Sequence, residues 1–137
     1  HVRQYLFIQK QRYGDKLQYE IEEDESLADY KLPKLVLQPL VENAIYHGIK
    51  EIDRQGMIRV TSAAEEGQLI LSIYDNGRGF ELRDSTDMTL PRLGGVGLKN
   101  VDQRLRLQFG DDYHMEIQSE PDKFTQISLY LPLDSDD

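Results

Sequence analysis

The stretch from Asp75 to Gly97 shows neither helical nor strand periodicity, and it lies between segments that do. It contains five glycines, one proline and scattered polar residues. An irregular loop of this length is uncommon inside a compact domain, and such loops usually act as functional lids. We therefore expect the regular elements on both sides of the stretch to form one frame that holds a functional loop.

The segments around this loop alternate between helical and strand periodicity. Before the loop, the pattern predicts a helix over His1 to Tyr13, a strand over Lys16 to Glu22, a helix over Leu32 to His47, and strands over Met57 to Ala63 and Gln68 to Tyr74. The last two strands are expected to pair as a hairpin through Glu65-Glu66-Gly67. After the loop, it predicts a helix over Val96 to Phe109 and strands over Met115 to Ser119 and Gln126 to Leu131.

The length of 137 residues and the 39% hydrophobic content fit one domain with a single two-layer core. Helices on one face of a mixed or antiparallel sheet would bury the observed pattern. The predicted fold class is therefore α+β, a two-layer α/β sandwich. Within the second helix, Pro39 lacks a backbone N–H group, so we expect it to cost one hydrogen bond and to bend the helix.

The formal charge of −9, from 25 acidic and 16 basic residues, narrows the range of partners. A surface of this sign repels nucleic acid and anionic membranes, so we expect this domain to contact neither. A small anion is compatible with it, because a local nest of backbone N–H groups can outweigh a distant negative field. The absence of cysteine excludes disulfides, thiolate chemistry and soft-metal sites. No apolar run is long enough to cross a bilayer.

Asn43 lies on the second predicted helix, one turn before His47, within Leu40-Val41-Glu42-Asn43-Ala44. A lone asparagine there is most simply a polar side chain in water. Its amide oxygen is also a hard, neutral donor suited to Mg²⁺, which takes its other ligands from water and substrate phosphates. His47 and Lys50 lie near Asn43 on a helical wheel and could face the same anion. Glu42 either accepts a proton, orients a nucleophile or faces solvent.

Asp75-Asn76-Gly77-Arg78-Gly79 directly follows a predicted strand. Asp-Asn-Gly is strong turn chemistry, so an ordinary turn explains this stretch. Alternatively, Asp75 at the buried strand end accepts a hydrogen bond from an exocyclic amine such as that of adenine. Gly77 and Gly79 would then let the backbone pass close to the purine.

Gly94-Gly95-Val96-Gly97-Leu98 opens a helix instead of ending one. Free N–H groups, the helix dipole and missing Cβ atoms make such a start an anion site, and Lys99 and Arg104 add positive charge. A flexible hinge is the plainer interpretation. The chain lacks Gly-x-x-x-x-Gly-Lys-Ser/Thr, and the glycine loop does not follow a first strand, so neither a P-loop nor a Rossmann fold is expected.

In this order, the three stretches resemble the N, G1 and G2 boxes of the Bergerat ATP-binding fold. The longer runs from Leu35 to Gly48 and from Gly97 to Leu105 are similar to sensor histidine kinases that pair with AraC-type or LytTR-type response regulators. The resemblance covers nearly the whole chain. It implies an ATP-binding catalytic domain of a two-component sensor histidine kinase, with a long ATP lid over about residues 80–95.

The resemblance also implies roles for single residues. Asn43 would coordinate the Mg²⁺ that bridges the ATP phosphates, and Glu42 would be the catalytic base. Asp75 would contact the adenine amine, with Thr125 as a second contact on the adenine side. The other ATP-binding residues that it implies are Tyr46, His47, Lys50, Gly77, Gly79, Gly95, Val96, Gly97, Leu98 and Lys99.

One segment departs from the pattern of these kinases. Relatives commonly carry Gly-Lys-Gly-Thr before the last strand, where this chain has Asp122-Lys123-Phe124-Thr125. Thr125 keeps its place. The two missing glycines remove the backbone freedom that the pattern supplies there.

By the same resemblance, residues 1–15 form a linker helix from a dimerisation and phosphoacceptor domain, and residues 16–137 form the catalytic domain. The acceptor histidine lies upstream in such kinases, in a His-Phe-Leu-Phe-Asn stretch that this sequence does not contain. The implied partners are that acceptor domain and a downstream response regulator, with a homodimer in the full-length protein. The implied location is a cytoplasmic domain of an integral membrane protein.

Two other functions are compatible with the same residues. The first is a Bergerat-fold ATPase, or an anti-sigma kinase that phosphorylates serine. The second is a nucleotide-sensing module without catalysis.

Overall fold

The structure is a computed structural model that describes residues 2–22, 37–49, 52–79 and 96–133. Within these ranges, side chains are described for all residues except 2–3, 37, 46–48 and 96–98. No helix in the described ranges is both long enough and apolar enough to cross a membrane. The predicted lid over about residues 80–95 lies outside them.

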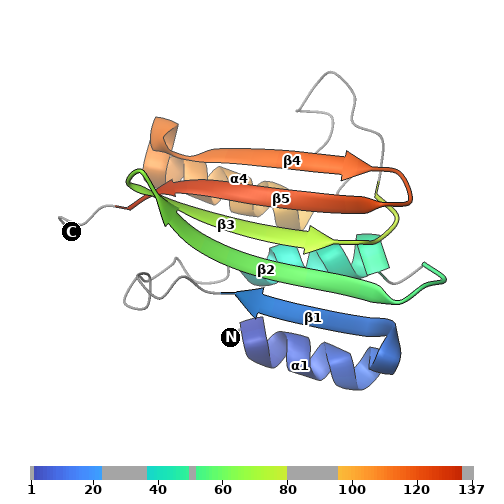
Figure 1. Ribbon diagram of the computed structural model, residues 1–137. Helices are drawn as coiled ribbons and strands as arrows, with labels where there is room; N and C mark the ends of the chain where they lie inside the picture. The colour runs from blue at the N-terminus through green and yellow to red at the C-terminus, as the bar shows by residue number, and fades with distance from the viewer. Residues whose placement is uncertain (1, 23–36, 50–51, 80–95, 134–137) are drawn as a thin grey trace.

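Five strands form one mixed sheet in the order β1-β2-β3-β5-β4 (Figure 1). They are β1 (Leu17–Glu22), β2 (Gly56–Glu65), β3 (Gln68–Asp75), β4 (His114–Glu120) and β5 (Phe124–Pro132). The edge strand β1 pairs with β2 in parallel, and the other neighbours pair antiparallel. Each predicted strand is present, with bounds that differ from the predicted ones by up to two residues.

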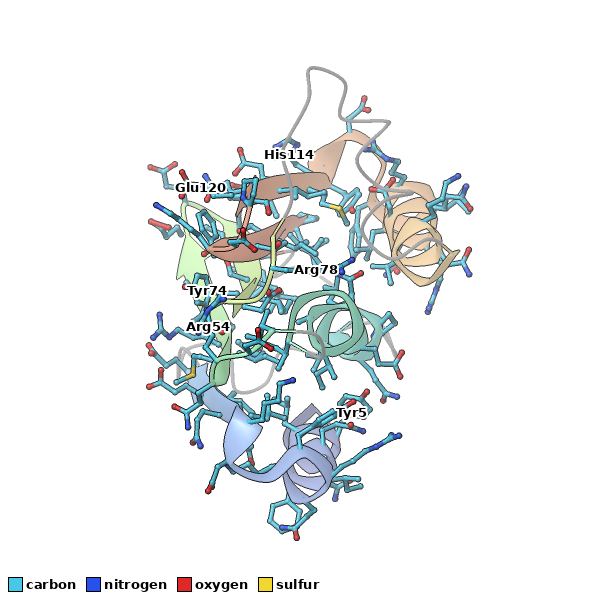
Figure 2. All side chains as sticks on the ribbon, turned by 90° about the vertical axis from the view of Figure 1, so that its right-hand side faces the viewer. Tyr5, Arg54, Tyr74, Arg78, His114 and Glu120 are labelled. Atoms are coloured by element: carbon cyan, nitrogen blue, oxygen red, sulfur yellow. The ribbon has the colours of Figure 1, made fainter. Side chains whose placement is uncertain are left out.

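The helical layer lies on one face of this sheet (Figure 2). Its elements are α1 (Val2–Tyr13), the turn η1 (Gly14–Lys16), α2 (Leu37–Asn43), the π-helical segment η3 (Ala44–Ile49), α4 (Val96–Phe109) and the turn η4 (Gly110–Asp112). A sheet with one covered face has one buried row of side chains per strand. The predicted α+β two-layer sandwich is confirmed.

The hairpin between β2 and β3 closes with a two-residue turn. Glu65 pairs with Gln68 across the ladder, and Glu66 and Gly67 both have positive φ, at 50° and 79°. Two central residues with positive φ are the mark of a type I′ turn, whose twist matches that of the flanking strands. The predicted hairpin is confirmed.

The buried side of the sheet is set by alternation along the strands. In β3, the buried residues are Leu69, Leu71, Ile73 and Asp75, and the residues between them are only half-buried. Asp75 therefore continues an apolar row into the space beneath the helices. The same core includes Leu6 of α1 and Leu17 of β1, both fully buried.

The second predicted helix differs from its prediction at its far end. Helical backbone continues past His47 to Ile49, and from Ala44 onward it takes the wider π form. The start predicted at Leu32 lies outside the described residues. The helix α2 includes Pro39, and the residue four positions before it lies outside the described residues, so the bend expected at Pro39 stays a prediction. Single π-helical turns of this kind are frequent at functional sites.

Candidate functional site

Asp75 ends β3 as a buried carboxylate, with 3% of its surface exposed. Its Oδ1 accepts a hydrogen bond of 2.9 Å from the backbone N–H of Gly77. Burial raises the pKa of Asp75 to about 7, and the hydrogen bond from Gly77 opposes that rise. Near neutral pH this side chain can therefore either accept a hydrogen bond as a carboxylate or donate one as an acid.

Thr125 lies beside Asp75, because the two residues are direct partners across β3 and β5. Thr125 is buried, and its Oγ1 lies 2.9 Å from Ser119 Oγ. The Ser119 hydroxyl donates to the carbonyl of Phe124 at 2.8 Å. Since each hydroxyl carries one proton, Thr125 is the donor to Ser119, and the lone pairs of Thr125 Oγ1 can still accept next to Asp75. The structure thus brings together two of the residues predicted on the adenine side.

Asn76 fastens the segment after β3 to the start of β2. Its Oδ1 accepts from the N–H of Met57 at 2.7 Å, its Nδ2 donates to the carbonyl of Gln55 at 3.2 Å, and its own N–H donates to Met57 at 3.2 Å. The Asn76 side chain therefore pairs with backbone groups of Gln55 and Met57, as the backbone of a neighbouring strand would. From the sequence, Asn76 was assigned no role beyond that of a turn residue, and these contacts were missed.

Gly79 packs against the turn between β4 and β5. Its φ is +55°, and an added Cβ would overlap the carbonyl of Glu120 and lie 2.8 Å from the carbonyl oxygen of Phe124. Both the backbone angle and the space therefore require glycine. Gly77 is buried one turn earlier, next to Asp75.

The turn Asp122-Lys123-Phe124-Thr125 keeps a left-handed residue although it lacks glycine. Asp122 has a φ of +62°, a conformation that aspartate tolerates better than most residues. Its N–H donates to the carbonyl of Arg78 at 2.6 Å. Phe124 stacks on Tyr74 with ring centroids 6.0 Å apart. The departure from Gly-Lys-Gly-Thr is accommodated by an aspartate in the left-handed region and by an aromatic pair.

Asn43 ends α2 and is buried, with 7% of its surface exposed. Among the described residues, its Oδ1 has no hydrogen-bond partner. A buried acceptor without a partner is costly, so such an atom calls for an explanation. An amide oxygen is a suitable ligand for a hard cation, and the donor set fits Mg²⁺ if substrate phosphates supply further oxygens.

The other predicted residues lie around the same elements. Glu42 is half-buried, and its Oε2 accepts a hydrogen bond of 3.3 Å from Gln38 Nε2. Lys99 is exposed in the first turns of α4. The backbone of Tyr46 and His47 belongs to η3, and that of Val96, Gly97 and Leu98 opens α4. Lys50 and Gly95 lie outside the described residues.

These elements meet at one end of the molecule. The segment η3 packs against β2, β3 and β5, and α2 packs against α4. Figure 1 shows that α4 begins at the end of the sheet where β3 stops. The end of β3, the turn before β5 and the start of α4 therefore share one side of the fold.

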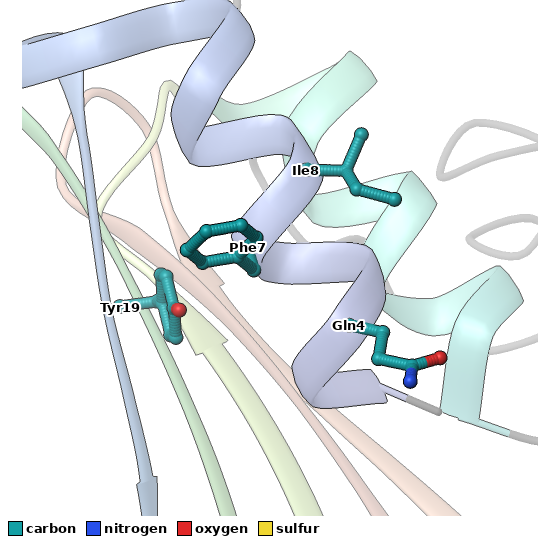
Figure 3. A pocket seen from close by; sticks show the side chains of 4 residues that line it. All are labelled: Gln4, Phe7, Ile8 and Tyr19. Atoms are coloured by element: carbon teal, nitrogen blue, oxygen red, sulfur yellow. The ribbon is translucent and has the colours of Figure 1, made fainter.

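A hollow of about 480 Å³ lies elsewhere, between α1 and the edge strand β1. It is lined by Gln4, Phe7, Ile8 and Tyr19 (Figure 3). None of these four residues is among the predicted site residues. We therefore place the candidate site at the end of β3 and not in this hollow.

Solved structures with the same fold are kinase domains. The chain matches the histidine kinase domain of the blue-light activated histidine kinase of Erythrobacter litoralis with a TM-score of 0.70 at 18% identity, over 96% of this chain and 63% of that one. It matches the catalytic domain of the histidine kinase ThkA with a TM-score of 0.68 at 18% identity, over 94% and 88% of the two chains. At these identities the likeness establishes the fold.

Several relatives in sequence are named as sensor kinases. The chain is 38% identical over 132 residues to the sensor histidine kinase BtsS of Escherichia coli, strain K12, and 35% identical over 133 residues to the sensor histidine kinase YesM of Bacillus subtilis. Each alignment covers 96% of this chain and 22% of the relative, so the chain spans about a fifth of these proteins.

Residues 28–135 match the family described as histidine kinase-, DNA gyrase B-, and HSP90-like ATPase. The chain belongs to this family. The family and the class of function predicted from the three motifs, an ATP-binding catalytic domain of the sensor histidine kinase type, are confirmed.

Proposed function

We propose that this chain binds Mg-ATP in the space between the end of β3 and the start of α4, and transfers the γ-phosphoryl group to a histidine on a separate dimerisation domain. The observation that carries this proposal is the buried Oδ1 of Asn43, which has no partner among the described residues. It lies in the helical layer over the sheet face into which the Asp75 carboxylate is buried.

The adenine end of the nucleotide lies at Asp75 in this proposal. As a carboxylate, Asp75 accepts a hydrogen bond from the exocyclic amine, and its neighbour Thr125 offers a second acceptor. Gly77 and Gly79 border the base in this proposal: Gly77 holds Asp75 Oδ1 through its N–H, and Gly79 packs closely against the turn before β5. The fixed hydrogen bond from Gly77 to Asp75 Oδ1 leaves Oδ2 for the ligand.

The phosphate end lies at the start of α4. Backbone N–H groups in the first turn of a helix are free to bind an anion, and the helix dipole favours negative charge there. The backbone of Val96, Gly97 and Leu98 supplies this turn, and Lys99 adds a charge. Gly95, Tyr46, His47 and Lys50 are further phosphate contacts in this proposal, on the strength of the family resemblance alone.

Asn43 Oδ1 would hold the Mg²⁺, which supplies charge neutralisation for the triphosphate. Transfer forms a P–N bond to the neutral imidazole nitrogen and breaks the P–O bond to ADP. The second ring nitrogen loses a proton, and Glu42, held by Gln38, is placed to accept that proton or to orient the ring. Catalysis rests mainly on positioning and on charge neutralisation.

The wider setting follows from the relatives and is part of the proposal. Residues 1–15 serve as the linker from the dimerisation domain, the stretch over about 80–95 closes over ATP, and the full-length protein is a homodimer that passes the phosphoryl group to a response regulator. The sensor kinases among the relatives suggest a membrane protein of which this is a cytoplasmic part.

Calorimetric titration with a non-hydrolysable ATP analogue, with and without Mg²⁺, tests the binding step. We expect binding that Mg²⁺ strengthens. Incubation with ATP and a supplied acceptor domain tests the transfer, and an acid-labile, base-stable label is expected. Acid-stable label would indicate a serine kinase, and phosphate release without label would indicate an ATPase. Tight binding without either would indicate a nucleotide sensor.

A further inference from the structure

We infer that Arg54 is a positioning residue of this site: its guanidinium ties the segment that follows Asp75 to the turn that precedes Thr125, and so fixes the wall that reads the base. The expected effect on nucleotide binding rests on the proposed function. The position of Arg54 rests on hydrogen bonds among described residues.

One nitrogen of Arg54 makes all the relevant contacts. Arg54 Nη2 donates to the backbone carbonyl of Asn76 at 2.5 Å, of Gly77 at 3.0 Å and of Asp122 at 3.0 Å. Figure 2 looks onto this end of the sheet and shows Arg54 just beneath Tyr74. A charged donor makes stronger hydrogen bonds than a neutral one.

The carbonyls of Asn76 and Asp122 belong to segments far apart in the sequence. Their oxygens are the negative ends of peptide dipoles, and three such oxygens gathered at one point repel each other. A guanidinium among them removes this repulsion. Arg54 is exposed, so water can hydrate the carbonyls when it is removed. Its loss should therefore loosen the two segments without unfolding the sheet.

The link to Asp75 runs through a single peptide group. The carbonyl of Asn76, which accepts from Arg54, and the N–H of Gly77, which donates to Asp75 Oδ1, are the two polar ends of the same planar unit. Fixing its oxygen fixes the direction of its N–H. Arg54 thereby orients the donor that holds the Asp75 carboxylate.

The link to Thr125 runs through the turn. Arg54 holds the carbonyl of Asp122, while the N–H of Asp122 donates to Arg78. Both contacts restrain Asp122, whose φ of +62° is uncommon for residues other than glycine. Arg54 thus restrains the left-handed residue of the turn that leads to Thr125.

The test compares Arg54→Ala, Arg54→Lys and the control Arg59→Ala. Arg59 is also an exposed arginine, but its guanidinium pairs with Glu20 and faces Tyr74. Affinity is measured for Mg-ATP, Mg-GTP and inorganic triphosphate. We expect Arg54→Ala to weaken ATP roughly tenfold, the effect of one charge-assisted hydrogen bond, and to reduce the preference for ATP over GTP. Triphosphate affinity should change less than about twofold.

Arg54→Lys should recover part of the loss, because the ammonium keeps the charge and can donate hydrogen bonds, but it lacks the planar, pre-organised fork of the guanidinium. Arg59→Ala should change nothing. Unchanged ATP affinity in Arg54→Ala, or an equal loss for ATP and triphosphate, would overturn the inference.

Amide hydrogen exchange separates this inference from the proposed function. In Arg54→Ala, the N–H groups of Gly77 and Asp122 should exchange faster while those in the middle of β3 keep their rates. If the wild-type chain bound no nucleotide, the proposed function would fail, and the exchange rates would still decide whether Arg54 orders the two segments. Unaltered exchange at both amides would refute that ordering.

Discussion

The Tyr113 hydroxyl donates a hydrogen bond of 2.8 Å to the Asp102 carboxylate, joining the end of η4 to the middle of α4. Asp102 is buried, and its other oxygen accepts from Arg106 at 3.1 Å. Burial and the neighbouring carboxylate raise the pKa of Tyr113, so the phenol stays a donor throughout the neutral range. This contact fixes the helix whose start is proposed to receive the phosphates.

We expect Tyr113→Phe to lower the free energy of unfolding by about 1–2 kcal/mol, because a buried carboxylate oxygen loses its donor. Urea unfolding measures the change. Tyr130→Phe is the matched control: its hydrogen bond to Glu116 is at the surface, and the expected change is within about 0.5 kcal/mol. Equal losses in both variants would contradict the structural role of the Asp102 contact.

ATP affinity should rise with pH through about 7. The pKa of Asp75 in the free protein is about 7. In the proposed site the adenine amine binds the carboxylate form, so protonation should compete with the nucleotide. Calorimetry between pH 5.5 and 8.5, a range of roughly 1.5 units on each side of 7, measures this. Asp75→Asn should bind ATP weakly and without this pH dependence. Equal losses of ATP and triphosphate affinity in that variant would mean that Asp75 does not read the base.

The contribution of Asp75 to folding stability should fall as pH rises, which is the opposite of the trend expected for ATP affinity. Its pKa is higher in the folded state than the ordinary value of 3.8, so the native state holds more protons between about pH 4 and 7. Stability from this group is present below pH 3.8 and is lost as pH rises through 7. Asp75→Asn should therefore stabilise the nucleotide-free chain above pH 7, by at most about 4 kcal/mol. Chemical unfolding at pH 5 and pH 8, about two units below and one above 7, checks the difference.

Asn43→Ala should remove the strengthening of ATP binding by Mg²⁺ while affecting stability little, because Oδ1 has no described partner to lose. The comparison of titrations with and without Mg²⁺ shows this directly. Asn100→Ala, an exposed asparagine on α4, should retain the full effect of Mg²⁺. Undiminished phosphorylation of a supplied acceptor domain by Asn43→Ala would refute the assignment.

Two glycines with nearly the same backbone angle give a matched pair. Gly79 has φ +55° and no room for a Cβ, whereas Gly110 has φ +59° and nothing within 4 Å. Gly110→Ala should cost about 1 kcal/mol, the usual strain of alanine at a positive φ. Gly79→Ala should cost clearly more and should also weaken ATP binding. Similar unfolding midpoints for the two variants would mean that the turn between β4 and β5 yields to the added methyl group.

Local patterns predicted most of the fold. The helix Val96–Phe109 has the predicted bounds, and β3 ends one residue beyond its predicted end, at Asp75. The alternation in β3 also explains why Asp75 is buried. The widening at Ala44–Ile49 was not predicted, since a stripe of apolar residues does not distinguish α from π spacing over one turn.

The features that the sequence did not predict depend on contacts between segments far apart in the chain. Asp75 and Thr125 were each singled out, but their pairing depends on the strand order, which places β5 beside β3. Arg54 gave no signal at all, because its three acceptors are backbone carbonyls that any sequence possesses. The roles of Glu42, His47, Lys50 and the glycines near the start of α4 stay predictions.

The burial of Leu6 couples movement of α1 to the sheet. This side chain is fully enclosed in the same core as Leu17, and Lys10 Nζ binds the carbonyl of Leu17 at 2.6 Å. Because of these contacts, rotation of α1 about its axis would also move β1. The strand β1 in turn pairs in parallel with β2. Rotation of α1 would therefore be transmitted through β1 and β2 to Gln55 and Met57, which hydrogen-bond the Asn76 side chain next to Asp75, the residue proposed to contact the base.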